Sequence, residues 1–202
     1  RCCSSDAEKR AREVARVLGM PFYVLNFSKE FKKRIVGYFL KEYQAGRTPN
    51  PCVVCNKEIK LGLLLEKAVA FGADYVATGH YAKLDMRCPT GHRMSNKLLM
   101  AKDKNKDQSY FLWQLNQEQL KHILFPVGDY TKKEVRKLAG KFGLPTVATP
   151  ESQEVCFIQK TTNEFLTRYI KLKPGKIVNT KREVLGKHQG LPFYTIGQRK
   201  GL

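Results

Sequence analysis

The sequence lacks several features that would place it in a common structural class. No run of residues approaches the roughly 20 consecutive apolar positions of a membrane-spanning helix, and no secretory signal is present. We find no internal repeat and no low-complexity tract. The hydrophobic share of 42% and the aromatic share of 10% exclude a disordered chain. At 202 residues, the chain can bury the core of one large domain, or of a large and a small one.

Acidic residues are scarce in comparison with basic ones. The chain has 18 Asp and Glu against 37 Lys and Arg, which gives a formal net charge of +19. A basic surface without a specific partner is one explanation. A nucleic-acid partner is favoured over it, because neutralising phosphates releases counterions and so increases affinity.

The six cysteines do not have the spacing of a disulfide framework. Cys52 and Cys55 form a Cys-x-x-Cys pair, which in a chain of this kind is typical of redox or metal chemistry. Cys156 follows a polar, acidic run. The other three have no matched spacing and are interpreted as non-catalytic: Cys2, Cys3 and Cys88.

Apolar periodicity predicts alternating helices and strands, which are typical of a parallel α/β sheet. Asp6 can cap a first helix, residues 22–27 have the pattern of a buried strand, and Ser28 can cap a second helix. We further expect a helix over residues 56–71, a strand over 74–78 and a capping box at 131–134. After about Asn163 the pattern changes to one short helix, over residues 164–172, followed by β-hairpins, which predicts a small second domain from about residue 161.

Three sites in this pattern have candidate chemistry. Cys55 is expected at a helix N-terminus, where the helix dipole and nearby lysines favour the reactive thiolate. His80 follows a strand and either contacts a nucleotide or closes a turn. Asp107, in the run Lys106-Asp-Gln108, could cap the helix that follows it.

Five motifs then occur in one order along the chain. They are Thr48-Pro-Asn-Pro-Cys-x-x-Cys-Asn-Lys-Glu-Ile-Lys60, Ala77-Thr-Gly-His-Tyr-Ala82, Lys106-Asp-Gln-Ser-Tyr-Phe111, Glu151-Ser-Gln-Glu-Val-Cys-Phe157 and Phe193-Tyr-Thr-Ile-Gly-Gln-Arg-Lys-Gly201. With these motifs the sequence closely resembles the bacterial tRNA-specific 2-thiouridylases, over essentially its whole length.

The resemblance implies a parallel-sheet α/β domain, similar to the ATP-pyrophosphatases and incomplete at its N-terminus, over residues 1–160. Residues 161–202 would begin a small central β-rich domain. The implied reaction uses ATP, with Mg²⁺, to adenylate the C2 oxygen of a wobble uridine in tRNA. Sulfur then replaces that oxygen, giving 2-thiouridine and AMP. The implied partners are tRNA and either a sulfur donor protein or sulfide, and the enzyme would be a cytoplasmic monomer without membrane association.

Site roles follow only from this resemblance. Cys55 would be the nucleophile and Cys156 the persulfide carrier, and the two would form a disulfide. Further residues would border the target base (Asn50, Pro51, Cys52), contact tRNA (Lys106, Asp107, Gln108) or border the ATP site (Gly79).

Two departures from the family pattern matter. The Ser-Gly-Gly-x-Asp-Ser pyrophosphate loop and the C-terminal β-barrel are absent, so we expect a piece truncated at both ends that cannot activate uridine alone.

The second departure is Cys52, which stands where many members have Asp. Members with three cysteines resemble thiolases that hold a [4Fe–4S] cluster on three thiolates, with one iron open to hydrosulfide. A cluster on Cys52, Cys55 and Cys156 is therefore expected, and the persulfide route stays open.

Two other functions compete with the thiolation enzyme. A non-catalytic RNA-binding module stabilised by zinc or a cluster would explain the charge, with His80 as the candidate fourth zinc ligand. A different ATP-pyrophosphatase, such as an amidating ligase, would explain the fold but not the cysteines.

Overall fold

The computed structural model describes residues 5–85, 96–145 and 155–201. It divides into two compact units: residues 1–27 and 52–152 form the first, and residues 28–51 and 153–202 form the second. The expected domain division between residues 160 and 161 stays a prediction. Within the described ranges, no helix combines the length and the apolar character that crossing a membrane requires.

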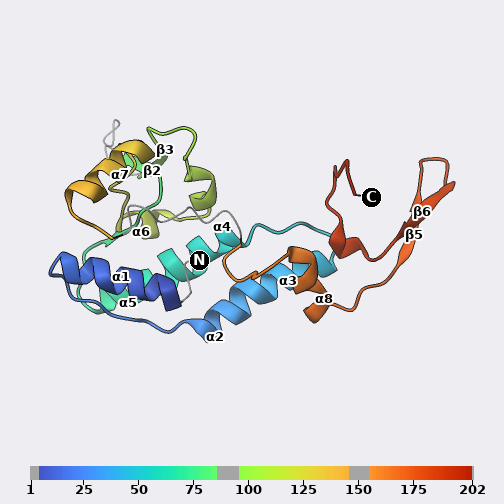
Figure 1. Cartoon of the computed structure of the whole chain (residues 1–202), viewed down its shortest axis with the longest axis horizontal. Coiled ribbons are helices and arrows are strands. Elements are labelled where there is room, and N and C mark those ends of the chain that lie inside the picture. The colour runs from blue at the N-terminus through green and yellow to red at the C-terminus, as the bar shows by residue number, and fades with distance from the viewer. Residues whose placement is uncertain (1–4, 86–95, 146–154, 202) are drawn as a thin grey trace. The chain divides into compact units, whose positions relative to one another are not determined.

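The first unit contains helices and short strands (Figure 1). In chain order these are α1 (Ser5–Val17), α4 (Pro51–Cys55), η2 (Asn56–Leu63), α5 (Leu64–Ala70), β1 (Val76–Ala77), β2 (Ala82–Asp85), β3 (Lys97–Met100), η3 (Ser109–Leu112), α6 (Gln117–Leu120), β4 (Ile123–Leu124) and α7 (Lys132–Lys141). The second unit contains α2 (Ser28–Phe31), η1 (Lys32–Val36), α3 (Gly37–Gln44), α8 (Thr162–Tyr169), β5 (Gly175–Val178), β6 (Val184–His188) and η4 (Leu191–Phe193).

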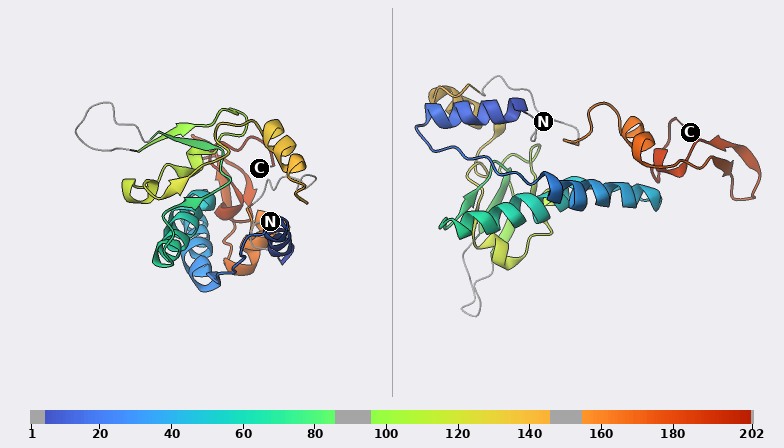
Figure 2. Two further views of the ribbon diagram at one scale, coloured as in Figure 1. Left: turned by 90° about the vertical axis from the view of Figure 1, so that its left-hand side faces the viewer. Right: turned by 90° about the horizontal axis from the view of Figure 1, so that it is seen from below.

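Two long helices are continuous rods that each include a π-helical stretch, and both rods can be followed in Figure 2. One comprises α2, η1 and α3; the other comprises α4, η2 and α5. The second rod ends before Gly72, whose φ of 86° is the left-handed conformation that commonly closes a helix. This end was expected from the sequence, as was the mixture of helices and strands with a parallel strand pair.

Strand pairing links distant segments of the first unit. β1 pairs with β4 in parallel, with Val76 opposite Ile123. β2 pairs with β3 in an antiparallel hairpin, with Ala82 opposite Met100. In the second unit β5 and β6 form the expected antiparallel hairpin. The parallel pair places the residues after β1 at a carboxyl edge of the sheet, where ligands bind in many α/β proteins.

Each unit has its own apolar core. The core of the first unit joins the long helix to both strand pairs through Leu61, Leu65, Ala82, Leu112, Ile123 and Phe125. The core of the second unit holds Phe39, Ile158, Leu166 and Ile170. Ile158 follows Cys156 by two residues, so core packing fixes the chain just after that cysteine.

The strand expected over residues 22–27 is wrong. These residues have no regular secondary structure, none is buried, and the Tyr23 side chain is 83% exposed. A strand needs a neighbour to accept its backbone hydrogen bonds, and among the described strands none pairs with this segment. The apolar pattern therefore lacks the partner that would bury it.

Candidate functional site

The Cys-x-x-Cys pair lies inside a helix rather than before one. The expected start at residue 56 is wrong, because the helix begins at Pro51. Proline suits the first helical position, where its fixed φ is favourable and the absent N–H leaves no bond unmade. Cys52 therefore lies in the first turn and Cys55 in the second. Residues three apart on a helix have Cβ atoms about 5–6 Å apart, so the two thiols share a face.

The helix is held in place directly after Cys55. Asn56 is 3% exposed, and its Nδ2 donates a hydrogen bond to the carbonyl oxygen of Phe111 at 3.0 Å. Gln119 Nε2 donates to the carbonyl oxygens of Lys57 at 3.1 Å and Leu61 at 2.7 Å. These bonds tie the π-helical stretch to the segment after β3. Sequence reasoning missed Asn56, although it stands one turn before the buried Ile59, on the apolar face of the helix.

Cys156 lies in the second unit, in a turn that precedes the buried Ile158. The backbone N–H of Ile158 donates to the carbonyl oxygen of Val155 at 3.1 Å. The ring of Phe157 packs edge-on against Phe39, with ring centroids 5.2 Å apart. A cavity of about 140 Å³ lies beside this turn; it is lined by Phe157, Gln159, Lys160, Thr161, Glu164, Phe165, Arg168 and Tyr169. Residues 151–154 of the same motif lie outside the described ranges.

The structure gives no support to a metal centre on the three cysteines. Cys52 is exposed, Cys55 and Cys156 are half-buried, and all three are thiols rather than disulfides. In the described part of the chain, no three His, Cys, Asp or Glu side chains are grouped as metal ligands. Cys2, Cys3 and Cys88 lie outside that part. A [4Fe–4S] cluster on these cysteines is therefore not supported by the described residues, and Cys156 belongs to the other unit.

His80 is held in a structural contact at the end of β1. Its Nδ1 lies 2.7 Å from Thr78 Oγ1, and the Thr78 backbone N–H donates to the carbonyl oxygen of Leu124. Burial, with a smaller contribution from the charge of Lys60, lowers the pKa of His80 to about 4. The imidazole is therefore neutral at pH 7. Gly79, beside it, has open space where a side chain would project, and its contact with ATP stays a prediction.

The run Lys106-Asp-Gln108 has a clear role inside the fold. Asp107 Oδ1 accepts a hydrogen bond from the backbone N–H of Ala101 at 2.7 Å, and its Oδ2 accepts one from Ser109 Oγ at 2.6 Å. Gln108 Oε1 accepts from the backbone N–H of Tyr81 at 3.0 Å. These bonds join the run to Ala101, directly after β3, and to Tyr81, directly before β2. The expected cap by Asp107 is wrong, because η3 has no side-chain cap and Asp107 binds Ala101 and Ser109 instead. Contact of Lys106, Asp107 and Gln108 with tRNA stays a prediction.

A mixed α/β unit with a parallel strand pair, paired cysteines on one helix and a third cysteine in a separate β-containing unit define a recognisable class. The chain belongs to the family described as tRNA methyl transferase HUP domain, whose model matches residues 1–160. The tRNA methyl transferase PRC-barrel domain matches residues 163–202. The fold is therefore an ATP-pyrophosphatase-like α/β domain followed by a small PRC-barrel domain. The sequence predicted the α/β domain and a small β-rich domain after it.

Curated relatives that match the chain are named tRNA-specific 2-thiouridylase MnmA. The protein from Moorella thermoacetica is 50% identical over 207 residues, a match that covers 100% of this chain and 56% of the relative. Those from Carboxydothermus hydrogenoformans and Clostridioides difficile are 48% and 47% identical, and 55% and 56% of their lengths are covered. The chain thus spans about half the length of the curated relatives it matches.

Proposed function

We propose that this chain is part of an enzyme that uses ATP to convert the wobble uridine of tRNA into 2-thiouridine. The observation that carries the proposal is the match of the whole chain to proteins named tRNA-specific 2-thiouridylase, with identities of 46–50%. The paired cysteines and Cys156 stand in the motifs on which the sequence resemblance rests. Adenylation by ATP, with Mg²⁺, belongs to this proposal, as does the place of Gly79 beside the nucleotide.

The cysteine chemistry we favour is a persulfide route. The outer sulfur of a persulfide on Cys156 attacks C2 of the adenylated uridine. The Cys55 thiolate then attacks the inner sulfur, the S–S bond to the nucleoside breaks, and AMP leaves. The products are 2-thiouridine and a Cys55–Cys156 disulfide. The two electrons that the transferred sulfur takes up come from Cys55 and Cys156, which are oxidised to the disulfide. A thiol reductant then reduces the disulfide and restores both cysteines.

The position of the Cys-x-x-Cys pair supports this assignment. The first turn of a helix presents backbone N–H groups without intrahelical partners and carries partial positive charge. This charge acts most strongly on Cys52 in the first turn and less on Cys55 in the second, where Lys57 and Lys60 on the same helix also favour the thiolate. Asn50 and Pro51 immediately precede Cys52 at the same helix end, which suits their proposed place beside the target base.

Thiolation by the complete protein tests the proposal. Transcribed tRNA, ATP, Mg²⁺ and a persulfide donor are supplied, and the nucleosides are identified by mass spectrometry. We expect 2-thiouridine from the wild type and none from Cys55→Ser or Cys156→Ser. A methylated uridine would instead agree with the family's description and would refute sulfur transfer. Unmodified uridine, with tRNA still bound, would favour the non-catalytic RNA-binding module.

A second experiment separates the persulfide from a [4Fe–4S] cluster. Cys52→Asp is prepared without oxygen and assayed for iron and for thiolation. In the persulfide route Cys52 is not essential, so thiolation is retained without iron. Loss of both thiolation and cluster absorbance would favour the cluster. The present chain offers a complementary test: after treatment with inorganic polysulfide, we expect an added sulfur on the tryptic peptide that contains Cys156.

A further inference from the structure

Helix α7 presents an unusually uniform charge to solvent. Its ten residues include five basic side chains and one acidic side chain, Glu134. Four of the basic residues are exposed: Lys133, Arg136, Lys137 and Lys141. Lys133, Lys137 and Lys141 are spaced four apart, so they lie along one face over about 12 Å. The fifth basic residue, Lys132, places its ammonium 5.6 Å from the centre of the Tyr81 ring.

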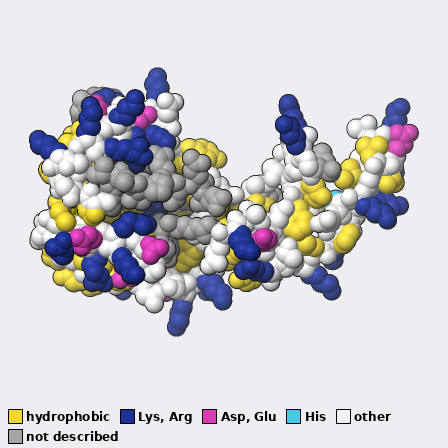
Figure 3. Space-filling view, viewed as in Figure 1, with side chains coloured by type: hydrophobic (Ala, Val, Ile, Leu, Met, Phe, Trp, Pro, Cys, Tyr) yellow, Lys and Arg dark blue, Asp and Glu magenta, His cyan; other side chains and the backbone are white. Residues whose placement is uncertain are grey.

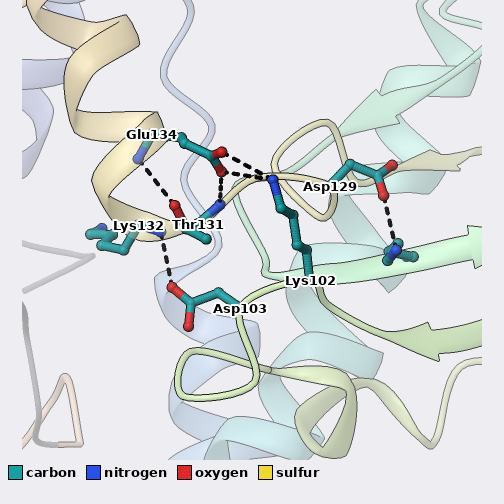
Figure 4. Close-up of polar contacts among 7 residues, drawn as sticks. Lys102, Asp103, Asp129, Thr131, Lys132 and Glu134 are labelled. Atoms are coloured by element: carbon teal, nitrogen blue, oxygen red, sulfur yellow. Dashed lines mark hydrogen bonds and ion pairs between the residues drawn. The ribbon is translucent and has the colours of Figure 1, made fainter.

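Glu134, the single acid of α7, makes its contacts at the start of the helix and not with Lys133, Lys137 or Lys141 (Figure 4). Glu134 Oε2 accepts a hydrogen bond from the backbone N–H of Thr131 at 2.6 Å, and the Thr131 side chain accepts from the Glu134 N–H. Lys102 Nζ donates to Glu134 at 3.0 Å. The Thr131 backbone bond, followed by the Lys102 and Thr131 side-chain bonds, lowers the pKa of Glu134 to about 2. The Glu134 carboxylate is therefore ionised and is already bonded to Thr131 and Lys102.

The same contacts attach a second basic segment to α7. Asp103 Oδ2 accepts a hydrogen bond from the backbone N–H of Lys132 at 2.9 Å, in addition to the Lys102–Glu134 ion pair. Lys104 directly follows Lys102 and Asp103 in the sequence, and its side chain is exposed. Asp103 and Glu134 thus both lie where residues 102–103 meet the start of α7, as Figure 4 shows. Figure 3 shows Lys and Arg side chains over the part of the first unit where α7 and β3 lie.

Helix α1 has a similar composition but a different arrangement. It carries four basic and three acidic residues. Arg12 pairs with Glu8 at 2.9 Å, and Arg16 pairs with Glu13 at 2.6 Å, all on the helix's own surface. The charges of Arg12 and Arg16 are therefore balanced locally. This helix serves as an internal control for the effect of basic residues as such.

We propose that Lys133, Lys137 and Lys141 of α7, together with Lys104, form a docking surface for the phosphate backbone of RNA. The inference rests on the proposed function, which supplies RNA as the substrate. A row of exposed cations without an interleaved acid fits a polyanion, and each phosphate that is neutralised releases counterions. Asp103 and Glu134 join the two basic segments at the start of α7.

The test compares two triple variants of this chain with equal charge loss. One is Lys133→Gln, Lys137→Gln and Lys141→Gln; the control is Lys9→Gln, Arg12→Gln and Arg16→Gln in α1. Glutamine is about as favourable to a helix as lysine or arginine, and circular dichroism verifies folding. Binding of transcribed tRNA is measured over a series of salt concentrations. Each lost phosphate contact lowers the salt slope by about 0.7–0.9, so we expect a decrease of about 2–3 for the α7 variant. The α1 control should change the slope by less than about 1.

Equal changes in both variants, or none in the α7 variant, would overturn the docking surface. Thiolation by the complete protein could still succeed in that case, so the proposed function would stand alone. If the α7 substitutions affect binding of poly-glutamate but not of tRNA, the surface serves an acidic protein and the RNA assignment is wrong. If the wild-type chain binds no RNA, this inference fails together with the RNA part of the proposed function.

Discussion

Residues 5–27 and residues 97–141 belong to the same unit, yet they are held by different means. The first segment contains α1 and the extended stretch after it, and none of its residues is buried. The second contains the fully buried Leu112 and Ile123, and side chains such as Asp107 and Gln119 bind backbone groups of other elements. Both segments have regular apolar patterns. The comparison shows that an apolar pattern leads to burial only where another element supplies a matching surface.

The strongest way to break the second segment is Gly128→Ala. A Cβ at this position would overlap the carbonyl oxygen of Ala82, and Gly128 O also accepts the backbone N–H of Lys102. Because backbone must move to make room, we expect a loss of about 3 kcal/mol or more in unfolding free energy. Gly140→Ala in α7 is the control: its Cβ meets open space, and it should stabilise by about 1 kcal/mol. Urea unfolding measures both, and equal effects would refute the argument.

Truncating one large apolar residue in each segment compares them directly. Leu112 is 1% exposed, so Leu112→Ala should cost about 2–5 kcal/mol. Tyr23 is 83% exposed, so Tyr23→Ala should change stability by less than about 0.5 kcal/mol. Thermal and urea unfolding are both suitable. A large effect of Tyr23→Ala would show that residues 22–27 are buried after all.

Lowering the pH should destabilise the better-packed part of the unit through His80. Its pKa falls from an ordinary 6.5 to about 4 in the folded state, so the neutral form is favoured by folding. The contribution is fully present above pH 6.5 and is lost as the pH falls toward 4. Between pH 7 and pH 5 the wild type should lose about 2 kcal/mol more than His80→Gln. Glu13→Gln in α1 should leave the pH dependence of stability in this range unchanged. Parallel profiles for wild type and His80→Gln would contradict the assignment.

The smallest expected difference in unfolding free energy is between the cap of α7 and a surface ion pair of α1. Thr131 caps α7 in a reciprocal capping box, and Thr131→Ala should cost about 1 kcal/mol. Arg16 of α1 makes an exposed ion pair, which is screened by solvent, so Arg16→Gln should cost much less than Thr131→Ala. Added salt should reduce the Arg16 effect and spare most of the Thr131 effect. A larger loss for Arg16→Gln would reverse the proposed difference.

Local features were predictable from the sequence. The capping box at Thr131, the end of the long helix at Gly72 and the β5–β6 hairpin follow from side-chain bonds and dihedral preferences within a few residues. The motif order likewise led to the family that the comparisons show. These features depend on interactions between residues that are close in the sequence. They can therefore be predicted without knowledge of the rest of the fold.

Tertiary contacts decided the rest. The sequence placed residues 22–27 in a buried strand and began the cysteine helix five residues too late, at Asn56. Nor could it show that Asp107 and Gln108 fasten strands, or that Glu134 pairs with Lys102, 32 residues away. Charge and apolar content were known from the sequence alone. Which acids are paired, and which lysines therefore face solvent, depended on elements meeting across long stretches of chain.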